Sequence, residues 1–328
     1  MFETKSGLRT IATLALTALL VTTGAAGANT ANAATKNQAT VNFLASKFVS
    51  GKYIEGFTPG QADFGFTLEA LLQRKALGEA GKGFSAAVRY NLQNTAVVGV
   101  SASNPGYLFD KDGTLNIGLA GKFAFVSKAV SANNGKLRGK ILAALKRSLT
   151  SAGDLRSAAA TTFDRAWVIL GFSANGLKTQ AAKLSSALIQ TQLSDGGFND
   201  GYTLDSSATD GTGIALQALA ATRYLGSAAN RATSAAAIVS AVKYLRSTQV
   251  NNDHWEAWGD YNTNGTAYAA MGIIAAGSPS LASATWLKGK VASDGGLQTP
   301  WSNGAGDTYA TAQAVVPMLN LSYLSLLK

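Results

Sequence analysis

The feature that most constrains this chain is an alternation of two kinds of helical segment along its length. The clearest unit begins at residues 179–192, where apolar side chains recur at helical spacing along one face. Asp195-Gly196-Gly197 then interrupts the helix, and a polar loop runs to Asp210. The next segment, Thr212 to Tyr224, is apolar on nearly every side, so it needs neighbours around most of its surface.

The same order recurs at a period of about 40 to 50 residues, which indicates a repeat architecture. Six helix pairs can be counted, and in each an amphipathic segment precedes a more apolar one. The pairs are 41–49 with 66–77, 84–93 with 116–130, 139–149 with 163–172, 179–192 with 212–224, 238–245 with 266–276, and 281–291 with 309–319. Because an apolar helix must be covered on several sides, this pattern predicts an all-α fold: an (α/α)6 toroid with an apolar inner ring and an amphipathic outer ring.

The first 33 residues have the three parts of a cleaved secretory signal peptide. Lys5 and Arg9 precede an apolar run from Ile11 to Val21, and small residues follow as far as Ala31-Asn32-Ala33. An uncleaved membrane anchor is the alternative, but a span needs roughly 20 mainly apolar residues, and this run gives way to Thr, Gly and Asn sooner. We therefore expect a secreted, extracellular monomer in which residues 34–328 form one toroid domain, with no membrane span after cleavage.

The composition excludes several kinds of chemical site and indicates which partners the surface can attract. The chain has no cysteine, which excludes disulfides, thiolate metal ligands and thiol catalysis. Its formal net charge is +10, and part of the excess is local, in Lys136, Arg138, Lys140, Lys146 and Arg147. Such a surface attracts anionic polymers, so non-covalent association with cell-envelope polymers is one expectation. No stripe of alternating aromatic and basic residues is present, and we expect no nucleic-acid partner.

A short motif then resembles a known family. The stretch TQLSDGGF, followed by a loop rich in Asp and Thr and by ALQALAA, resembles the repeat of prenyltransferases and of squalene or terpene cyclases. Gln192, Asp195-Gly196-Gly197 and Phe198 match the repeat core, and Asp294-Gly295-Gly296 matches it a second time. The chain particularly resembles exported bacterial proteins that carry this repeat on one α/α toroid. The resemblance implies that fold, with the Gln and the aromatic residue tying each loop to the neighbouring helix.

The chemistries of that family are incomplete in this chain. Class II terpene cyclases protonate an alkene with an Asp-x-Asp-Asp-Thr motif, and only Asp210 remains of its three aspartates. The zinc site of protein prenyltransferases needs a cysteine, and the magnesium sites of ionising terpene synthases need clustered aspartates. The chain has no Cys and no Asp-Asp pair. We therefore expect no metal site and no cofactor.

Polar and aromatic side chains gather at or just before the expected inner helices. The carboxylate and amide candidates are Asp63, Asp112, Asp164, Asp205, Asp210, Asn262, Asn264 and Asp307. If the inner helices are parallel, these side chains meet at one mouth of the ring, although each could equally cap its helix, and the two roles are compatible. Aromatic candidates in the same loops are Phe198, Tyr202, Trp255, Trp258, Tyr261 and Trp301. Such rings suit a small apolar molecule or a glycan.

Three classes of function remain open. The first is a protein without cyclase chemistry that binds a ligand or a cell-envelope component at the mouth. The second is a secreted enzyme, either a terpenoid cyclase that uses Asp210 or a glycan-cleaving enzyme that pairs Glu256 with Asp210 or Asp307. The third is a structural protein held at the cell wall by its basic surface.

Overall fold

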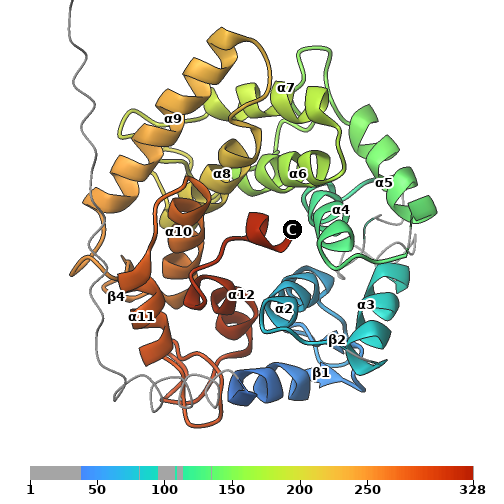
Figure 1. Cartoon of the computed structure of the whole chain (residues 1–328), viewed down its shortest axis with the longest axis vertical. Coiled ribbons are helices and arrows are strands. Elements are labelled where there is room, and N and C mark those ends of the chain that lie inside the picture. The colour runs from blue at the N-terminus through green and yellow to red at the C-terminus, as the bar shows by residue number, and fades with distance from the viewer. Residues whose placement is uncertain (1–37, 81, 95–107, 109–113, 134, 328) are drawn as a thin grey trace, which may run out of the picture. The chain divides into compact units, whose positions relative to one another are not determined.

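A computed structural model describes residues 38–80, 82–94, 108, 114–133 and 135–327, and residues 36–328 form one compact unit. The expected signal peptide and Asp112 lie outside the described residues. Within the unit, helices form two concentric rings (Figure 1). The inner ring consists of α2 (Phe64–Ala76), α4 (Ile117–Ala129), α6 (Thr162–Ala174), α8 (Thr209–Thr222), α10 (Thr263–Ala275) and α12 (Thr308–Met318). The outer ring consists of residues 38–46, α3 (Lys82–Asn94), α5 (Gly135–Arg147), α7 (Lys178–Ile189), α9 (Ala228–Ser247) and α11 (Leu281–Gly289).

The distribution of apolar residues explains which helices lie inside. In α8, 11 of 14 residues are buried, whereas in α5 only Ile141 and Leu145 are buried. Each inner helix packs on the inner helices before and after it, and α12 packs on α2, so the ring is closed. The predicted (α/α)6 toroid is therefore confirmed. Two short antiparallel strand pairs are added in the loops: β1 (Phe48–Val49) with β2 (Tyr53–Ile54), and β3 (Glu256–Ala257) with β4 (Asp260–Tyr261).

The repeated Asp-Gly-Gly motif forms the corners of the ring. The side chain of Gln192 donates hydrogen bonds to the carbonyl of Gly196, at 2.8 Å, and to that of Ala237 in α9, at 2.9 Å. Gly196 has a φ of +92°, and a Cβ there would lie 2.7 Å from the carbonyl oxygen of Ser240, so only glycine fits. Each corner thus joins a loop to the next outer helix.

The second complete motif closes the ring between its last and first units. Gly295 also has a φ of +92°, and a Cβ there would lie 2.3 Å from the carbonyl oxygen of Ala39 in the first outer helix. Asp294 accepts hydrogen bonds from the backbone amides of Gly296 and Gly306, at 3.0 Å each, which fixes the loop before α12. The corner used inside the chain is therefore used again to join its two ends.

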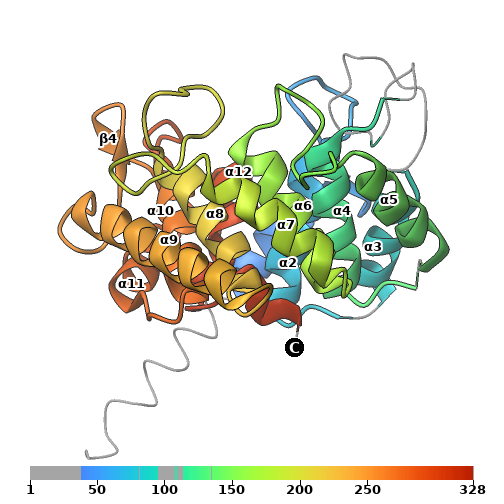
Figure 2. The same cartoon turned by 90° about the horizontal axis from the view of Figure 1, so that it is seen from above.

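A buried threonine near the start of four inner helices holds the preceding loop. Its hydroxyl oxygen accepts a hydrogen bond from the backbone amide of an apolar or aromatic loop residue. The pairs are Thr67 with Ile54 at 3.0 Å, Thr212 with Phe198 at 2.9 Å, Thr266 with Trp255 at 3.0 Å, and Thr311 with Leu297 at 2.8 Å. These bonds place the loops at the N-terminal ends of the inner helices, on one side of the ring, which we call the mouth (Figure 2).

Glycines allow two pairs of inner helices to approach closely. A Cβ on Gly213 of α8 would lie 2.3 Å from the carbonyl carbon and oxygen of Tyr268 in α10. In the neighbouring pair, a Cβ on Gly121 of α4 would lie 2.6 Å from the carbonyl carbon of Trp167 in α6. The helices α4 with α6, and α8 with α10, make the most extensive contacts in the ring.

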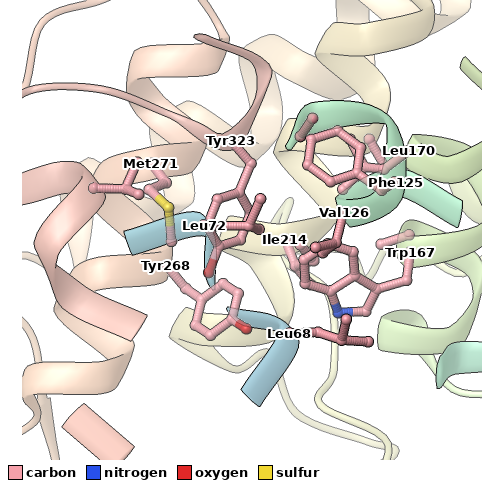
Figure 3. Close-up of a cluster of buried hydrophobic side chains, with 14 of the residues drawn as sticks. Leu68, Leu72, Phe125, Val126, Trp167, Leu170, Ile214, Tyr268, Met271 and Tyr323 are labelled. Atoms are coloured by element: carbon pink, nitrogen blue, oxygen red, sulfur yellow. The ribbon is translucent and has the colours of Figure 1, made fainter. Parts of the chain in front are cut away.

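The C-terminal segment fills the centre of the ring from the side opposite the mouth (Figure 2). The 3₁₀ helix η1 (Tyr323–Leu327) contacts α2, α4, α8 and α10. The side chain of Tyr323 is fully buried and packs against Trp167, Tyr268 and Phe125, with ring centroids 5.5 to 6.5 Å apart (Figure 3). The interior below the mouth is thus occupied by aromatic side chains. Within the described part of the chain, no helix combines the length and the apolar character needed to cross a bilayer.

Candidate functional site

A cavity of about 750 Å³ opens at the mouth, and we call it the mouth cavity. Its walls come from all six inner helices and from the loops before α8 and α10, so residues far apart in the sequence converge there. Four carboxyl groups line it: Asp63, Glu69, Asp200 and Asp210. Five aromatic rings line it as well: Phe66, Phe163, Tyr202, Trp258 and Tyr268. Lys122 and Gln313 contribute the other long polar side chains.

Asp210 differs from the other acidic residues at the starts of inner helices. Asp63 and Asp307 are N-caps that accept hydrogen bonds from backbone amides of the first turn, at 2.9 and 2.7 Å. Asp164 forms a capping box with Thr161. In α8 the N-cap residue is Ala208, which has no side-chain cap, and Asp210 follows within the first turn. The Asp210 carboxyl therefore does not close the helix end, although its Oδ1 accepts a hydrogen bond from the Gly211 amide at 2.8 Å.

The surroundings of Asp210 and Asp200 shift their pKa values in opposite directions. Burial raises the pKa of Asp210, and the negative charge of Asp200 adds to this, while the hydrogen bond from Gly211 opposes it. Burial alone would raise the pKa of Asp200 too. However, hydrogen bonds from the amides of Thr203 and Tyr202 and from the Thr203 hydroxyl outweigh that effect and lower it. The mouth cavity thus holds one carboxyl that retains its proton to a higher pH beside one that ionises readily.

A buried charged network forms the floor of the cavity. Glu69 is only 1% exposed and makes an ion pair with Lys122 from the neighbouring helix α4. Its Oε2 accepts hydrogen bonds from the hydroxyls of Tyr268, at 2.9 Å, and Tyr323, at 3.3 Å. Burial and the charge of Glu69 raise the pKa of both tyrosines well above the ordinary value, so they remain protonated donors. The floor is therefore polar and fully occupied, and it connects the mouth to the C-terminal segment.

A second cavity of about 210 Å³ adjoins the mouth cavity, and Trp258 lines both. Among the residues expected from the sequence, this second cavity is lined by Tyr261, Asn262, Asn264, Trp301 and Asp307. Asp63, Tyr202 and Asp210 line the mouth cavity. The two cavities therefore bring together nine of the candidate residues, counting the shared Trp258.

The remaining candidates lie elsewhere. Phe198 and Trp255 are in the core, at 0% and 1% exposure, because they occupy the aromatic position of the repeat. Asp164 is used in its capping box, and Asp205 is exposed on the loop before α8 without lining either cavity. Glu256 lies in β3 with its Oε1 3.8 Å from Nε2 of His254, and it too lines neither cavity. The expected pairing of Glu256 with Asp210 or Asp307 therefore has no shared cavity to support it.

Nine lining residues of the mouth cavity were not expected from the sequence, among them Glu69, Lys122, Asp200 and Tyr268. The sequence does carry a signal for the first two, because each is a charged residue flanked by non-polar residues in the middle of an inner helix, and such residues are seldom buried unless they are paired. Asp200 and Tyr268 carry no such signal.

Other possible sites fit less well. Among the described residues, no three His, Asp or Glu side chains are grouped so that they could hold a metal ion. A cavity of about 800 Å³ lies between α3 and α5 in the outer ring, but its described lining residues include no carboxyl group. The mouth cavity is the place where acidic, basic and aromatic groups converge.

Known structures resemble this chain in fold. An α-1,6-mannanase of Salegentibacter, as an inactive variant in complex with α-1,6-mannotriose, matches with a TM-score of 0.61 at 10% identity over 90% of this chain and 99% of that one. A type II terpene cyclase of Scytonema, in complex with geranylgeranyl dihydroxybenzoate, matches with a TM-score of 0.62 at 15% identity over 89% and 98%. An unsaturated glucuronyl hydrolase of Bacillus, responsible for degrading glycosaminoglycan, matches with a TM-score of 0.57 at 12% identity over 89% and 96%.

The chain is an α/α toroid. These likenesses support the fold that the repeat resemblance implied, and at such low identity they show the fold alone. Neither a protein-family model nor a curated protein sequence matches the chain. These three neighbours act on glycans or on a terpenoid substrate. The fold does not decide between such chemistries, so the choice depends on the residues of this chain.

Proposed function

We propose that the protein is a secreted glycan-cleaving enzyme that binds its substrate in the mouth cavity and uses Asp210 as its general acid. The observation that carries this proposal is the placement of Asp210. It lies two residues after the N-cap Ala208, in the first turn of α8, and its carboxyl lines a cavity that it shares with Asp200. Two carboxyl groups whose pKa values are driven apart in one cavity are the arrangement that glycosidic cleavage requires.

The reaction can be written with these two residues. The protonated Asp210 gives its proton to the oxygen of the departing sugar as the bond from that oxygen to the anomeric carbon breaks. A water molecule forms the new bond to the anomeric carbon, and the ionised Asp200 takes up its proton. The rings of Tyr202 and Trp258 offer flat apolar surfaces on which a sugar can pack, while its hydroxyl groups meet the polar side chains.

The negative charge of the mouth cavity limits which sugars the protein can accept as substrates. Among the described residues that line the cavity, Lys122 is the one cation that opposes Asp63, Glu69 and Asp200, and it is already paired with Glu69. A sugar that carries a carboxylate would be repelled by this excess of negative charge. The proposed substrate is therefore a neutral glycan or one with amino groups, and not a uronic-acid polymer.

The terpenoid alternative is less well supported. A polyprenyl chain needs a long apolar space, but the interior below the mouth is filled by Trp167, Tyr268 and Tyr323 (Figure 3). The floor of the mouth cavity also holds the buried ion pair of Glu69 with Lys122. The basic cluster on α5, with exposed Lys136, Lys140, Lys146 and Arg147, lies in the outer ring. It supports a non-covalent contact with anionic envelope polymers as an accessory to the same role.

The test is a release assay for reducing sugar on neutral, amino and uronic-acid polysaccharides. We expect cleavage in the first two classes and a loss of at least about 100-fold in kcat with Asp210→Asn. Asp205→Asn is the matched control, because it removes an exposed carboxyl on the same loop that lines neither cavity. Full activity of Asp210→Asn would refute the proposed mechanism. Retention of a polysaccharide without any cleavage would instead support the binding protein considered above.

A further inference from the structure

The exposed aromatic side chains are concentrated on the mouth side of the ring. Among the described residues, five large aromatic side chains are markedly exposed, and Phe57, Tyr202, Trp258 and Trp301 all belong to loops at the mouth. The fifth, Tyr224, follows the C-terminal end of α8. A soluble protein gains nothing in folding free energy from exposed rings, and their concentration on one face indicates a binding surface.

Trp258 is held in a conformation that its own side chain disfavours. The two residues between β3 and β4 are Trp258 and Gly259, with φ values of +55° and +83°. A two-residue hairpin loop with both φ values positive favours Asn or Gly at its first position, and a bulky residue there is strained. Trp258 is nevertheless 89% exposed, so packing within the protein does not compensate for the strain. The hairpin therefore presents this ring outward, at the boundary between the two cavities.

The second cavity has the size and chemistry of a place for one unit of a larger ligand. Its volume, about 210 Å³, is below the range of about 300 to 1,000 Å³ usual for a complete ligand site. Trp301 lies on its rim at 69% exposure, and Asn264 supplies a polar group. Asn264 also donates a hydrogen bond of 2.6 Å to Gln313, which lines the mouth cavity. The two cavities are thus joined through both Trp258 and the Asn264–Gln313 pair.

We propose that the second cavity is a subsite for a neighbouring sugar of the same chain, so that the protein selects oligosaccharides extending from the mouth cavity across Trp258 to Trp301. This inference rests on the proposed glycan-binding role of the mouth. A disaccharide that occupies the mouth cavity does not reach Trp301, whereas a longer chain packs on both rings. The length of the glycan, more than its terminal sugar, then determines affinity.

The test measures binding of neutral oligosaccharides of two and of six sugars, with α-1,6-mannosyl, β-1,4-glucosyl and β-1,4-N-acetylglucosaminyl linkages, to Asp210→Asn protein by calorimetry. This background prevents cleavage during the measurement. We expect at least one six-sugar probe to bind about tenfold more tightly than its two-sugar counterpart, and Trp301→Ala to remove that difference. Tyr224→Ala is the matched control, because it removes an equally exposed ring far from the mouth, and it is expected to change neither affinity.

The possible outcomes distinguish the proposed subsite from the proposed hydrolytic role of the mouth cavity. If Trp301→Ala binds the six-sugar probe as tightly as its parent, the second cavity is not a subsite, even where cleavage by the native protein is observed. If Trp301→Ala abolishes the length preference of a protein that cleaves nothing, the subsite stands and the hydrolytic role fails. Absence of binding to every probe refutes both.

Discussion

The close approach of α8 and α10 makes Gly213→Ala a sharp test of the ring geometry. In an ordinary helix interior, replacing Gly by Ala stabilises the protein by about 1 kcal/mol. At Gly213 the new Cβ would lie 2.3 Å from the carbonyl of Tyr268, about 1 Å inside normal contact distance, and the obstacle is backbone that cannot rotate away. Overpacking of this kind costs about 1 to 3 kcal/mol, and here it also separates one of the two most extensive helix contacts in the ring. We expect a net loss of about 2 kcal/mol.

Urea unfolding followed by tryptophan fluorescence measures this loss as a lower midpoint at unchanged slope. The control is Gly139→Ala in the outer helix α5, where nothing lies within 4 Å of the new Cβ. That substitution is expected to raise stability by about 0.5 to 1 kcal/mol. Opposite signs for the same chemical change are the decisive result. If both substitutions shift the midpoint in the same direction, the inner helices are not packed as closely as described.

Two further predictions concern the interior and the acid. Tyr323→Ala should lower the free energy of unfolding by about 3 to 5 kcal/mol, because it removes the side chain that fills the centre of the ring. Tyr323→Phe should lower it by about 1.5 to 3 kcal/mol, because it removes only one hydrogen-bond donor to Glu69. Equal urea midpoints for the two variants would contradict this packing. The pKa of Asp210 is raised above 3.8 in the folded state. The stability that this shift contributes is therefore fully present below about pH 3.8 and is lost as the pH rises through the pKa of Asp210 in the folded protein. Asp210→Asn lacks this loss, so its stability relative to the native protein should grow with pH, and a constant difference from about pH 3 to 8 would refute the raised pKa.

The architecture was predictable because each repeat unit contains an apolar helix that must be covered by neighbours on most of its sides. A segment such as residues 212–224, apolar on all sides, can be satisfied only inside a ring of neighbours, and six copies leave little choice of arrangement. The corners could also be located from the Asp-Gly-Gly motifs, since Gly196 and Gly295 have a backbone conformation and close contacts that require glycine.

The site was only partly predictable, because side-chain direction within a loop depends on a few tertiary bonds. Trp255 and Trp258 are three residues apart and look alike in the sequence, yet one is buried and the other is exposed. The difference follows from the bond between the Trp255 amide and Thr266, which repeats the Phe198–Thr212 bond and draws that residue inward. Asp200 could not be found at all, since its pKa depends on the turn formed by Tyr202 and Thr203.

The corner at Gly295, which packs on Ala39, has a consequence for how the chain reaches its native state. The contacts that join the last unit to the first, including those of α12 with α2, link segments separated by most of the sequence, so they carry the largest loop-closure entropy. An open stack of helix pairs can form before these contacts do, but its end surfaces would be exposed apolar helices. Closure of the ring is then the late, slow step of folding, and the mouth, whose walls come from both ends of the chain, exists only once that step is complete.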